Sequence, residues 1–370
     1  MLSYKKTRFL KKILPYVVIF QIGGFLYLFI ERGIMGELKQ YPSTGNSYSF
    51  WISLLTLPSI SALMSITVGI LEEYVFKNLL RKKSFLLKIL LKNTLYVFII
   101  FTVIVIASMV PNILLWGFAS DQSELVAPAV KFASDFSILS VITYCGAIIG
   151  VSLFFSEMVD YIGLNATTNF ITGKYSESKV EDRVFMFLDM KSSTTIAEKL
   201  GHERYYQLLN TYYMDMTSAI ISTRGEIYQY VGDEIVLSWQ FARGIEDSNC
   251  LRCFFLIKDQ MKKRCEYYEN KFGVFPEFKA GLHYGKVTTG EVGIIKKEIL
   301  FTGDVLNTTA RIQGLCNEQG TDLLISEDLK TALDIEERYE LLPKGSFELR
   351  GRDQKIKLFA AERKRKADSN

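Results

Sequence analysis

The stretch Val184–Thr195, VFMFLDMKSSTT, decides the fold of the second half of the chain. It opens with an apolar run of strand length, ends that run at the carboxylate of Asp189, and continues with small hydroxyl residues before a helical pattern begins. A carboxylate at a strand end can hold a hard cation such as Mg²⁺, and the free amides of a first helical turn can hold phosphate. The alternative is that Asp189 or Ser192 only caps the helix.

Composition limits the class of protein and its partners. The chain has 370 residues, 49% of them hydrophobic, and the apolar excess lies before residue 160. A net charge of +4 is too small to indicate nucleic acid as a partner. Five cysteines and two histidines fit neither a disulfide framework nor a structural zinc site. We therefore expect reduced thiols in a cytosolic compartment.

Four apolar segments in the first half each approach the length of about 20 residues with which a helix crosses a bilayer. They are Ile13–Ile30, Phe50–Ile70, Leu95–Phe118 and Phe136–Phe155. The segment 86–91, which is followed by a lysine and contains another, lies at the interface or extends the third helix into the cytoplasm. The sequence thus predicts a four-span anchor in the lipid bilayer.

The distribution of basic residues orients these spans. Lys and Arg crowd the N-terminus and the link between the second and third spans, whereas the other two links are poor in both. We therefore expect a multi-pass protein of the cell (inner) membrane, with its N-terminus and everything after Met158 in the cytoplasm. Glu72 and Glu73 close the second span, where we expect them in the headgroup layer; buried, they would suggest an ion or ligand path.

From Arg183 onward strands and helices alternate, which predicts an α+β domain with mainly antiparallel pairing. Strands are expected at 184–188, 227–231, 235–239, 278–283, 286–291, 322–325, 339–342 and 355–360, and helices at 196–222, 246–270 and from 305 to about 317. Gly232-Asp233 predicts one tight hairpin, and Tyr284-Gly285 predicts a second. Before this domain, the linker 157–182 continues the last span as a helix and breaks at Gly173.

Two further elements complete a candidate site with Asp189. Asp233 lies at the tip of the first hairpin, on a different strand, where it and Asp189 can share divalent cations that carry a triphosphate. Asn307 and Arg311 are four residues apart and share one helix face, where an amide and a guanidinium can hold ribose and phosphate. Each has a structural alternative: Asp233 as an ordinary turn residue, and Asn307 with Arg311 as a solvated helix face.

Taken together, these stretches resemble the class III nucleotidyl cyclases over about Glu181 to Ala361. FLDMKSST is similar to the family's first metal-binding strand, YVGDEIVL to its Gly-Asp hairpin, and TGDVLNTTARIQ to its G-[DN]-x-x-N-x-x-x-R signature. AGLHYGKVTTGEVG resembles a further hairpin motif of the family, with Gly281, Gly285 and Gly290 in place. The resemblance implies a cyclase catalytic domain with a ferredoxin-like core.

The resemblance also implies roles for individual residues. Asp189 and Asp233 would bind two Mg²⁺ or Mn²⁺ ions, Asn307 would orient the ribose, and Arg311 would stabilise charge at the α-phosphate. The residues expected to contact the phosphates are Met190, Lys191, Ser192, Ser193 and Thr194, through their backbone, and Arg352. One domain would supply both aspartates and another would supply Asn307 and Arg311, so a head-to-tail homodimer with two sites is expected.

The positions that read the base depart from the family's usual pairs. Gln229 and Leu300 occupy them; Gln229 can donate and accept hydrogen bonds, Leu300 can only pack, and Glu298 reaches the base only if the strand register slips. We expect a membrane-anchored enzyme that turns ATP into its cyclic monophosphate. Open alternatives are a guanylate or pyrimidine nucleotide cyclase and a non-catalytic nucleotide-binding sensor. A diguanylate cyclase is disfavoured by the lack of a GGDEF-like hairpin.

These observations predict four parts along the chain. Residues 1–158 form the transmembrane domain, 159–180 a cytoplasmic linker, 181–362 the catalytic domain and 363–370 a charged tail.

Overall fold

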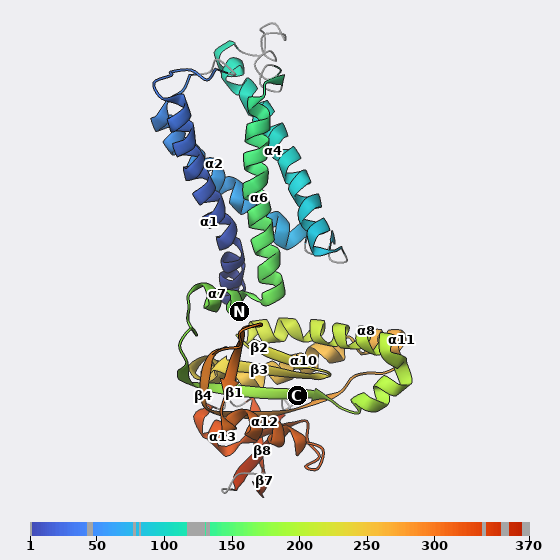
Figure 1. The fold of residues 1–370 in the computed structure, drawn as a ribbon. Coiled ribbons are helices and arrows are strands. Elements are labelled where there is room, and N and C mark those ends of the chain that lie inside the picture. Colours follow the sequence, from blue (N-terminus) through green and yellow to red (C-terminus); the bar gives the residue numbers. More distant parts are fainter. Residues whose placement is uncertain are drawn as a thin grey trace, which may run out of the picture. The chain divides into compact units, whose positions relative to one another are not determined.

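The computed structural model describes residues 2–42, 47–76, 79–80, 83–116, 130, 134–334, 338–348 and 355–364. The chain divides into two compact units, Lys6–Thr167 and Thr168–Asn370, and the division assigns Met1–Lys5 to the second. The first unit is helical and the second is built on one sheet (Figure 1). Each unit is described below by itself.

The helical unit consists of long apolar helices that match the predicted anchor (Figure 1). They are α1 (Leu2–Met35), α2 (Phe50–Leu71) with the π-helical turn η1 (Glu72–Phe76), α4 (Phe85–Trp116) and α6 (Ser137–Ile162). Within the described residues, four segments are long and apolar enough to cross a membrane: Lys12–Met35, Phe50–Phe76, Phe85–Val103 and Ile138–Ile162. Helix α4 begins at Phe85, so residues 86–91 extend the third helix; Phe118 lies outside the described residues.

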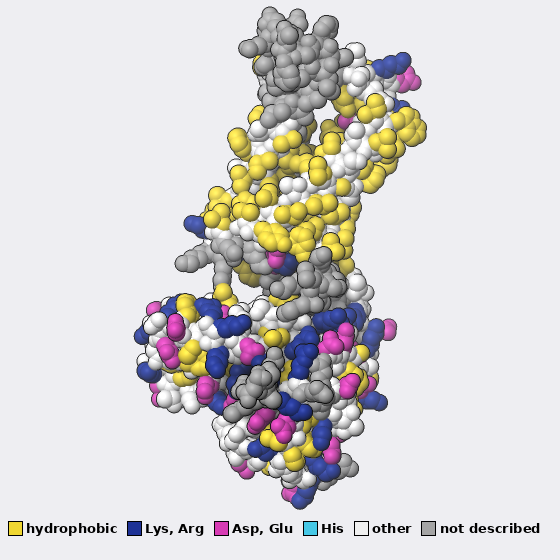
Figure 2. Space-filling view, turned by 180° about the vertical axis from the view of Figure 1, so that it is seen from behind, with side chains coloured by type: hydrophobic (Ala, Val, Ile, Leu, Met, Phe, Trp, Pro, Cys, Tyr) yellow, Lys and Arg dark blue, Asp and Glu magenta, His cyan; other side chains and the backbone are white. Residues whose placement is uncertain are grey.

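Apolar side chains point outward from this unit as well as inward. The outward-facing ones include Leu14, Ile22, Phe29, Trp51, Leu55, Leu63 and Phe98, which are 57–73% exposed. Figure 2 shows these apolar surfaces over the helices, in contrast to the mixed Lys, Arg, Asp and Glu surface of the other unit. A helix bundle that is apolar on its outside as well as its inside is suited to hydrocarbon surroundings.

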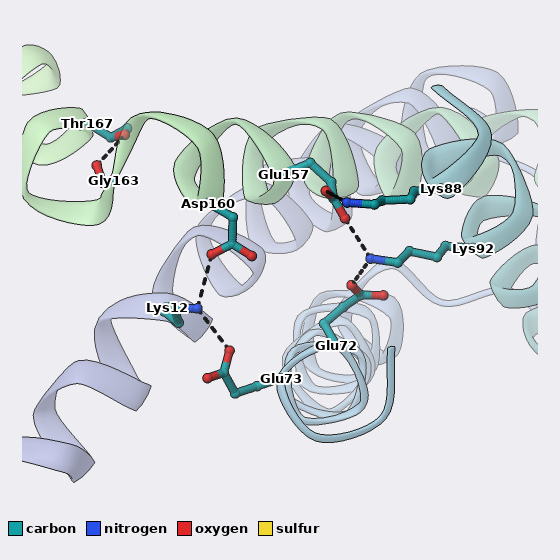
Figure 3. Close-up of polar contacts among 9 residues, drawn as sticks. All are labelled: Lys12, Glu72, Glu73, Lys88, Lys92, Glu157, Asp160, Gly163 and Thr167. Carbon is teal, nitrogen blue, oxygen red and sulfur yellow. Dashed lines mark hydrogen bonds and ion pairs between the residues drawn. The ribbon is translucent and has the colours of Figure 1, made fainter. Parts of the chain in front are cut away.

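A network of ion pairs ties the helices together at one end of the bundle (Figure 3). Lys92 of α4 is 4% exposed and bonds to Glu72 of η1 at 2.5 Å and to Glu157 of α6 at 2.8 Å. Tyr96 donates a further hydrogen bond to Glu72 at 3.0 Å, and Lys88 lies 3.4 Å from Glu157. Both acids have only 10% of their side chains exposed, so the network compensates charges that would be costly if they were buried singly.

Lys12 of α1 joins the same end of the bundle from the other side (Figure 3). Its ammonium lies 3.0 Å from Glu73 and 3.1 Å from Asp160 of α6. Helices α1, α2 with η1, α4 and α6 therefore each contribute a charge. The glutamates expected as lone headgroup residues are ion-paired inside the unit, while their depth in a membrane stays a prediction.

The linker breaks earlier than its sequence indicated. Helix α6 continues the fourth span to Ile162, as predicted, but Gly163 then adopts φ +95°, which L-residues rarely adopt. A short helix, α7 (Leu164–Ile171), follows before Gly173, where the break was expected. The positive φ of Gly163 thus ends α6, and a new helix rather than a loop follows.

The second unit is an eight-stranded sheet with helices on both faces (Figure 1). The strands are β1 (Lys179–Met190), β2 (Glu226–Val231), β3 (Glu234–Gln240), β4 (Phe278–Val292), β5 (Glu298–Thr302), β6 (Leu323–Ser326), β7 (Tyr339–Phe347) and β8 (Ile356–Arg363). Their order is β2-β3-β1-β4-β6-β8-β7, with β5 paired to β4. Among the strands that the structure describes, only β4 and β6 pair in parallel, which confirms the α+β class with mainly antiparallel pairing.

Helices cover the sheet because its central strands are apolar on both faces. Along β1, Val184, Met186 and Leu188 enter the larger core, whereas Phe185 enters a smaller one on the opposite face. The helices are α8 (Ser193–Ser222), α9 (Phe241–Ile245), the 3₁₀ turn η2 (Glu246–Ser248), α10 (Asn249–Lys263), α11 (Cys265–Phe272), α12 (Asp304–Gly314) and α13 (Glu327–Ala332). In Figure 1, α8 and α10 lie on one side of the sheet and α12 on the other.

Two expectations about this unit are wrong. Tyr284-Gly285 forms no turn: β4 runs straight through it and pairs with β1 from Phe278 to Thr289, and the real turn comes at Gly293, with φ +93°. The helix expected at 246–270 is divided into η2, α10 and α11, because Asp247 and Ser248 adopt positive φ and Arg264 leaves helical geometry at φ −109° and ψ 15°. Helix α13, which follows β6, was not expected.

Candidate functional site

Asp189 and Asp233 meet at one end of the central strands. Strand β1 pairs with β3 up to Leu188 and Ile235, so Asp189, the next residue of β1, lies beside the β2–β3 turn that carries Asp233. Gly232 opens this turn at φ +62°, a conformation that glycine adopts without strain.

A tyrosine from α8 fixes the hairpin that carries Asp233. The Tyr213 hydroxyl donates to the carbonyl of Gly232 at 2.8 Å, and its ring lies 4.5 Å from that of Tyr230, centre to centre. The carboxylate of Asp233 is therefore presented by a turn that is held from the helix side as well as by its own strands.

The two carboxyl groups lie within hydrogen-bonding reach of each other. Burial raises the pKa of Asp189 to about 6, with further contributions from a hydrogen bond to Asp233 and from the charge of Asp233. Burial, together with the charges of both aspartates, raises the pKa of Glu234 to about 7. Such a concentration of negative charge is what a bound divalent cation would relieve, so the donor set fits the cation that the sequence predicts.

Two residues that sequence reasoning missed hold Asp189 in place. Gln313 of α12 donates from Nε2 to Asp189 Oδ2 at 3.1 Å. The Lys279 ammonium of β4 lies 3.8 Å from the same oxygen, and its side chain is 12% exposed. The register Asp189–Lys279 across β1 and β4 was not predictable from the sequence, because the order of the strands in the sheet was not known.

The segment after Asp189 leads into the first turn of α8. Ser192 has φ +54° and makes no side-chain capping bond, so the alternative that it only caps the helix has no support. The amide of Lys191 donates to the carbonyl of Glu277, whereas the amides of the first helical turn have no acceptor within the helix. Met190 is buried in the core.

The side chain of Lys191 is engaged elsewhere. It pairs with Asp322, which also accepts a hydrogen bond from Lys258 at 2.6 Å. These two lysines hold the pKa of Asp322 below its usual value, although burial opposes them. The ammonium of Lys191 is thus bonded to Asp322 and its amide to Glu277, so the predicted phosphate contacts in this segment fall to the amides of Ser192, Ser193 and Thr194.

Helix α12 carries the predicted Asn307 and Arg311. The side chain of Asn307 is exposed, and one guanidinium nitrogen of Arg311 is buried without a hydrogen-bond partner in the described part of the chain. A buried guanidinium nitrogen without an acceptor fits a site for an anion. Within one chain, a hydrogen bond from Gln313 connects α12 to the aspartate pair. Among the described hydrogen bonds and ion pairs, none joins Asn307 or Arg311 to these aspartates.

The base-reading candidates lie on two strands whose side chains touch. Gln229 of β2 is exposed and Leu300 of β5 is 41% exposed. The rings of their neighbours Tyr228 and Phe301 are 4.9 Å apart, centre to centre, although β3, β1 and β4 separate the two strands in the sheet. Arg352 lies outside the described residues.

Comparisons with known proteins agree with this arrangement. The adenylate and guanylate cyclase catalytic domain family matches residues 176–362. The chain is 32% identical over 222 residues to "Adenylate cyclase 2" of Rhizobium meliloti (strain 1021), covering 60% of this chain and 61% of that protein. It is 28% identical over 180 residues to "Adenylate cyclase" of Anabaena cylindrica, covering 47% of this chain and 35% of the relative. The chain thus spans about three fifths or less of these relatives.

A solved structure shares the fold. A bacterial light-regulated adenylyl cyclase superposes with a TM-score of 0.53 at 19% identity, over 62% of this chain and 66% of that one. At this identity the likeness concerns the fold alone.

Proposed function

Because the chain belongs to the family of adenylate and guanylate cyclase catalytic domains, we propose that it is a membrane-anchored class III nucleotidyl cyclase. It converts a nucleoside triphosphate, ATP first, into the 3′,5′-cyclic monophosphate and pyrophosphate for intracellular signalling. The observation that carries the proposal is the pairing of half-buried Asp189 with Asp233; burial first, and Asp233 second, raise the pKa of Asp189 to about 6. Paired, half-buried carboxylates of this kind are suited to divalent cations.

In the proposed reaction the ribose 3′-oxygen attacks the α-phosphorus, and pyrophosphate leaves. Asp189 and Asp233 hold the cations; two Mg²⁺ or Mn²⁺ ions, when bound, supply activation of the 3′-hydroxyl and neutralisation of the triphosphate. Asn307 orients the ribose through its amide. Arg311 stabilises the charge that grows on the α-phosphate, which suits a guanidinium that has a nitrogen without an acceptor.

The triphosphate tail is proposed to lie against the start of α8. The first-turn amides, from Ser192 to Thr194, point out of the helix N-terminus, where backbone donors and the helix dipole favour phosphate. Ser192 turns the chain into this position with φ +54°. Arg352 is proposed as a further phosphate contact on the strength of the family resemblance.

The active enzyme is proposed to be a head-to-tail homodimer with two sites. Support comes from α12: Gln313 reaches Asp189 of its own chain at 3.1 Å, whereas Asn307 is exposed. Asn307 and Arg311 therefore serve the aspartate pair of a second copy. Each site then takes Asp189 and Asp233 from one protomer and the other two residues from its partner.

ATP is the first choice of substrate because the relatives from Rhizobium meliloti and Anabaena cylindrica are named adenylate cyclases. Gln229 of β2 and Leu300 of β5 are proposed to contact the base, where the amide of Gln229 can donate and accept. We propose further that the helical unit anchors the protein in the cell membrane, with the N-terminus and the catalytic domain in the cytoplasm, as the basic residues indicate.

The test is turnover by the purified full-length protein with Mn²⁺ and each of the four nucleoside triphosphates in turn, with products identified by mass spectrometry. Cyclic AMP as the main product is expected, and the Asp189→Ala variant is the inactive control. Cyclic GMP or a cyclic pyrimidine nucleotide as the main product would replace the base assignment. No cyclic product from any of the four would reject the enzyme in favour of a nucleotide-binding sensor.

A further inference from the structure

Helix α12 is connected to the aspartate pair of its own chain by one side chain. Gln313 Nε2 donates to Asp189 Oδ2 at 3.1 Å across 124 residues of sequence. Gln313 is 7% exposed, so this hydrogen bond forms with little competition from water. A hydrogen bond to a charged group is stronger than one between neutral groups, so it favours one orientation of the carboxylate.

The same helix presents its other functional residues on a different face. Asn307 and Arg311 are one turn apart and share a face, whereas Gln313 follows Arg311 by two residues, about 200° further around the axis. Under the homodimer proposed above, Asn307 and Arg311 belong to one active site and Gln313 contacts the carboxylate of the other. Helix α12 thus lies between the two sites.

Backbone contacts make α12 a rigid connection rather than a flexible one. A Cβ on Gly281 of β4 would lie 2.4 Å from the backbone nitrogen of Gln313 and 2.8 Å from the carbonyl oxygen of Thr309, so the helix lies directly on the strand. The Cys316 thiol, just beyond α12, also bonds to the carbonyl of Ala280. A displacement at Gln313 is therefore transmitted along the helix and is not absorbed by loose packing.

We propose that Gln313 is a positioning residue that locks α12 to the metal-binding carboxylate of its own protomer. The cation bound at one site thereby fixes the helix that supplies Asn307 and Arg311 to the other site. This inference rests on the proposed function, because it uses the cation site and the shared-site homodimer. It assigns to Gln313 a role in coupling the two sites.

The first measurement is Mn²⁺ binding to the full-length protein without nucleotide, followed by electron paramagnetic resonance. Gln313→Met keeps the length of the side chain and removes the donor. Loss of a residue that orients a metal ligand typically costs about 10–100-fold in metal affinity, so a weakening of tenfold or more is expected. Gln207→Leu, an exposed change on α8, is the matched control and should leave the affinity unchanged. A weakening smaller than tenfold in Gln313→Met overturns the proposal.

The second measurement tests the coupling itself and does not depend on how Gln313 variants fold. In the wild type, Mn²⁺ alone should slow backbone hydrogen–deuterium exchange in α12 (Asp304–Gly314), because the fixed carboxylate holds Gln313 and through it the helix. Asp189→Ala should abolish the slowing. Unchanged exchange in wild-type α12 overturns the proposal. If the wild type forms cyclic product but Mn²⁺ does not slow exchange in α12, only the coupling is rejected. Failure to form cyclic product rejects the proposed function.

Discussion

Lowering the pH from 7 to 5 should weaken Mn²⁺ binding at the aspartate pair about tenfold. A cation competes with the proton on Asp189, whose pKa is raised to about 6 by burial and by Asp233. A carboxyl with that pKa is about nine-tenths ionised at pH 7 and about one-tenth at pH 5. Glu234, with its pKa raised to about 7, loses its negative charge over the same range and adds to the fall. With the ordinary value of 3.8, Asp189 would stay about nine-tenths ionised at pH 5.

The assay is a Mn²⁺ titration of the purified protein without nucleotide, read by electron paramagnetic resonance at pH 7, 6 and 5. Asp233→Asn serves as the control: it removes the like charge, so the pH dependence should flatten while the overall affinity falls. Equal affinities at pH 7 and pH 5 in the wild type would refute the reasoning, because they would require Asp189 to be ionised throughout.

Two further changes test the packing. Gly281→Ala should destabilise the catalytic unit by about 1–3 kcal/mol, as overpacking does, because its Cβ meets the backbone of α12 at 2.4 Å. Gly285→Ala, whose Cβ would meet only a side chain at 3.3 Å, should lower the free energy of unfolding less in a urea melt. Equal losses of unfolding free energy would contradict this packing. Lys92→Met should destabilise the helical unit by about 3–5 kcal/mol, as removal of one partner of a buried ion pair does. It should lower the thermal unfolding temperature in detergent more than Lys88→Met does. The reverse order would show that Lys92 is not the centre of the network.

Local patterns predicted most of the elements because those patterns reflect local physics. The apolar run before Asp189 and the Gly232-Asp233 turn both depend on neighbours in sequence, and both formed as predicted. The turn predicted at Gly285 was wrong because a glycine indicates a close approach of two elements as readily as it indicates a turn. Here a Cβ would meet Val305 of α12 at 3.3 Å. A glycine that makes room for a distant helix cannot be recognised from its own neighbours.

The residues of the site could be predicted only where they belong to a sequence motif. Asp189 and Asp233 were paired from their places at two strand ends, and the structure brings their carboxyl groups together. Gln313 and Lys279 were not found, because their contacts with Asp189 join residues 124 and 90 positions apart through the packing of α12 and the register of β4. A sequence shows such residues only once the sheet order is known.

The shared active site is tested most directly by mixing two inactive variants. Asp189→Ala and Asn307→Ala should each be inactive as homodimers, while a heterodimer retains one complete site. If equal amounts pair at random, half of the dimers are mixed and each has one site of two, so cyclase activity should return to about a quarter of the wild-type value. A mixture no more active than either variant alone would contradict the assignment of the aspartates and Asn307 to opposite protomers.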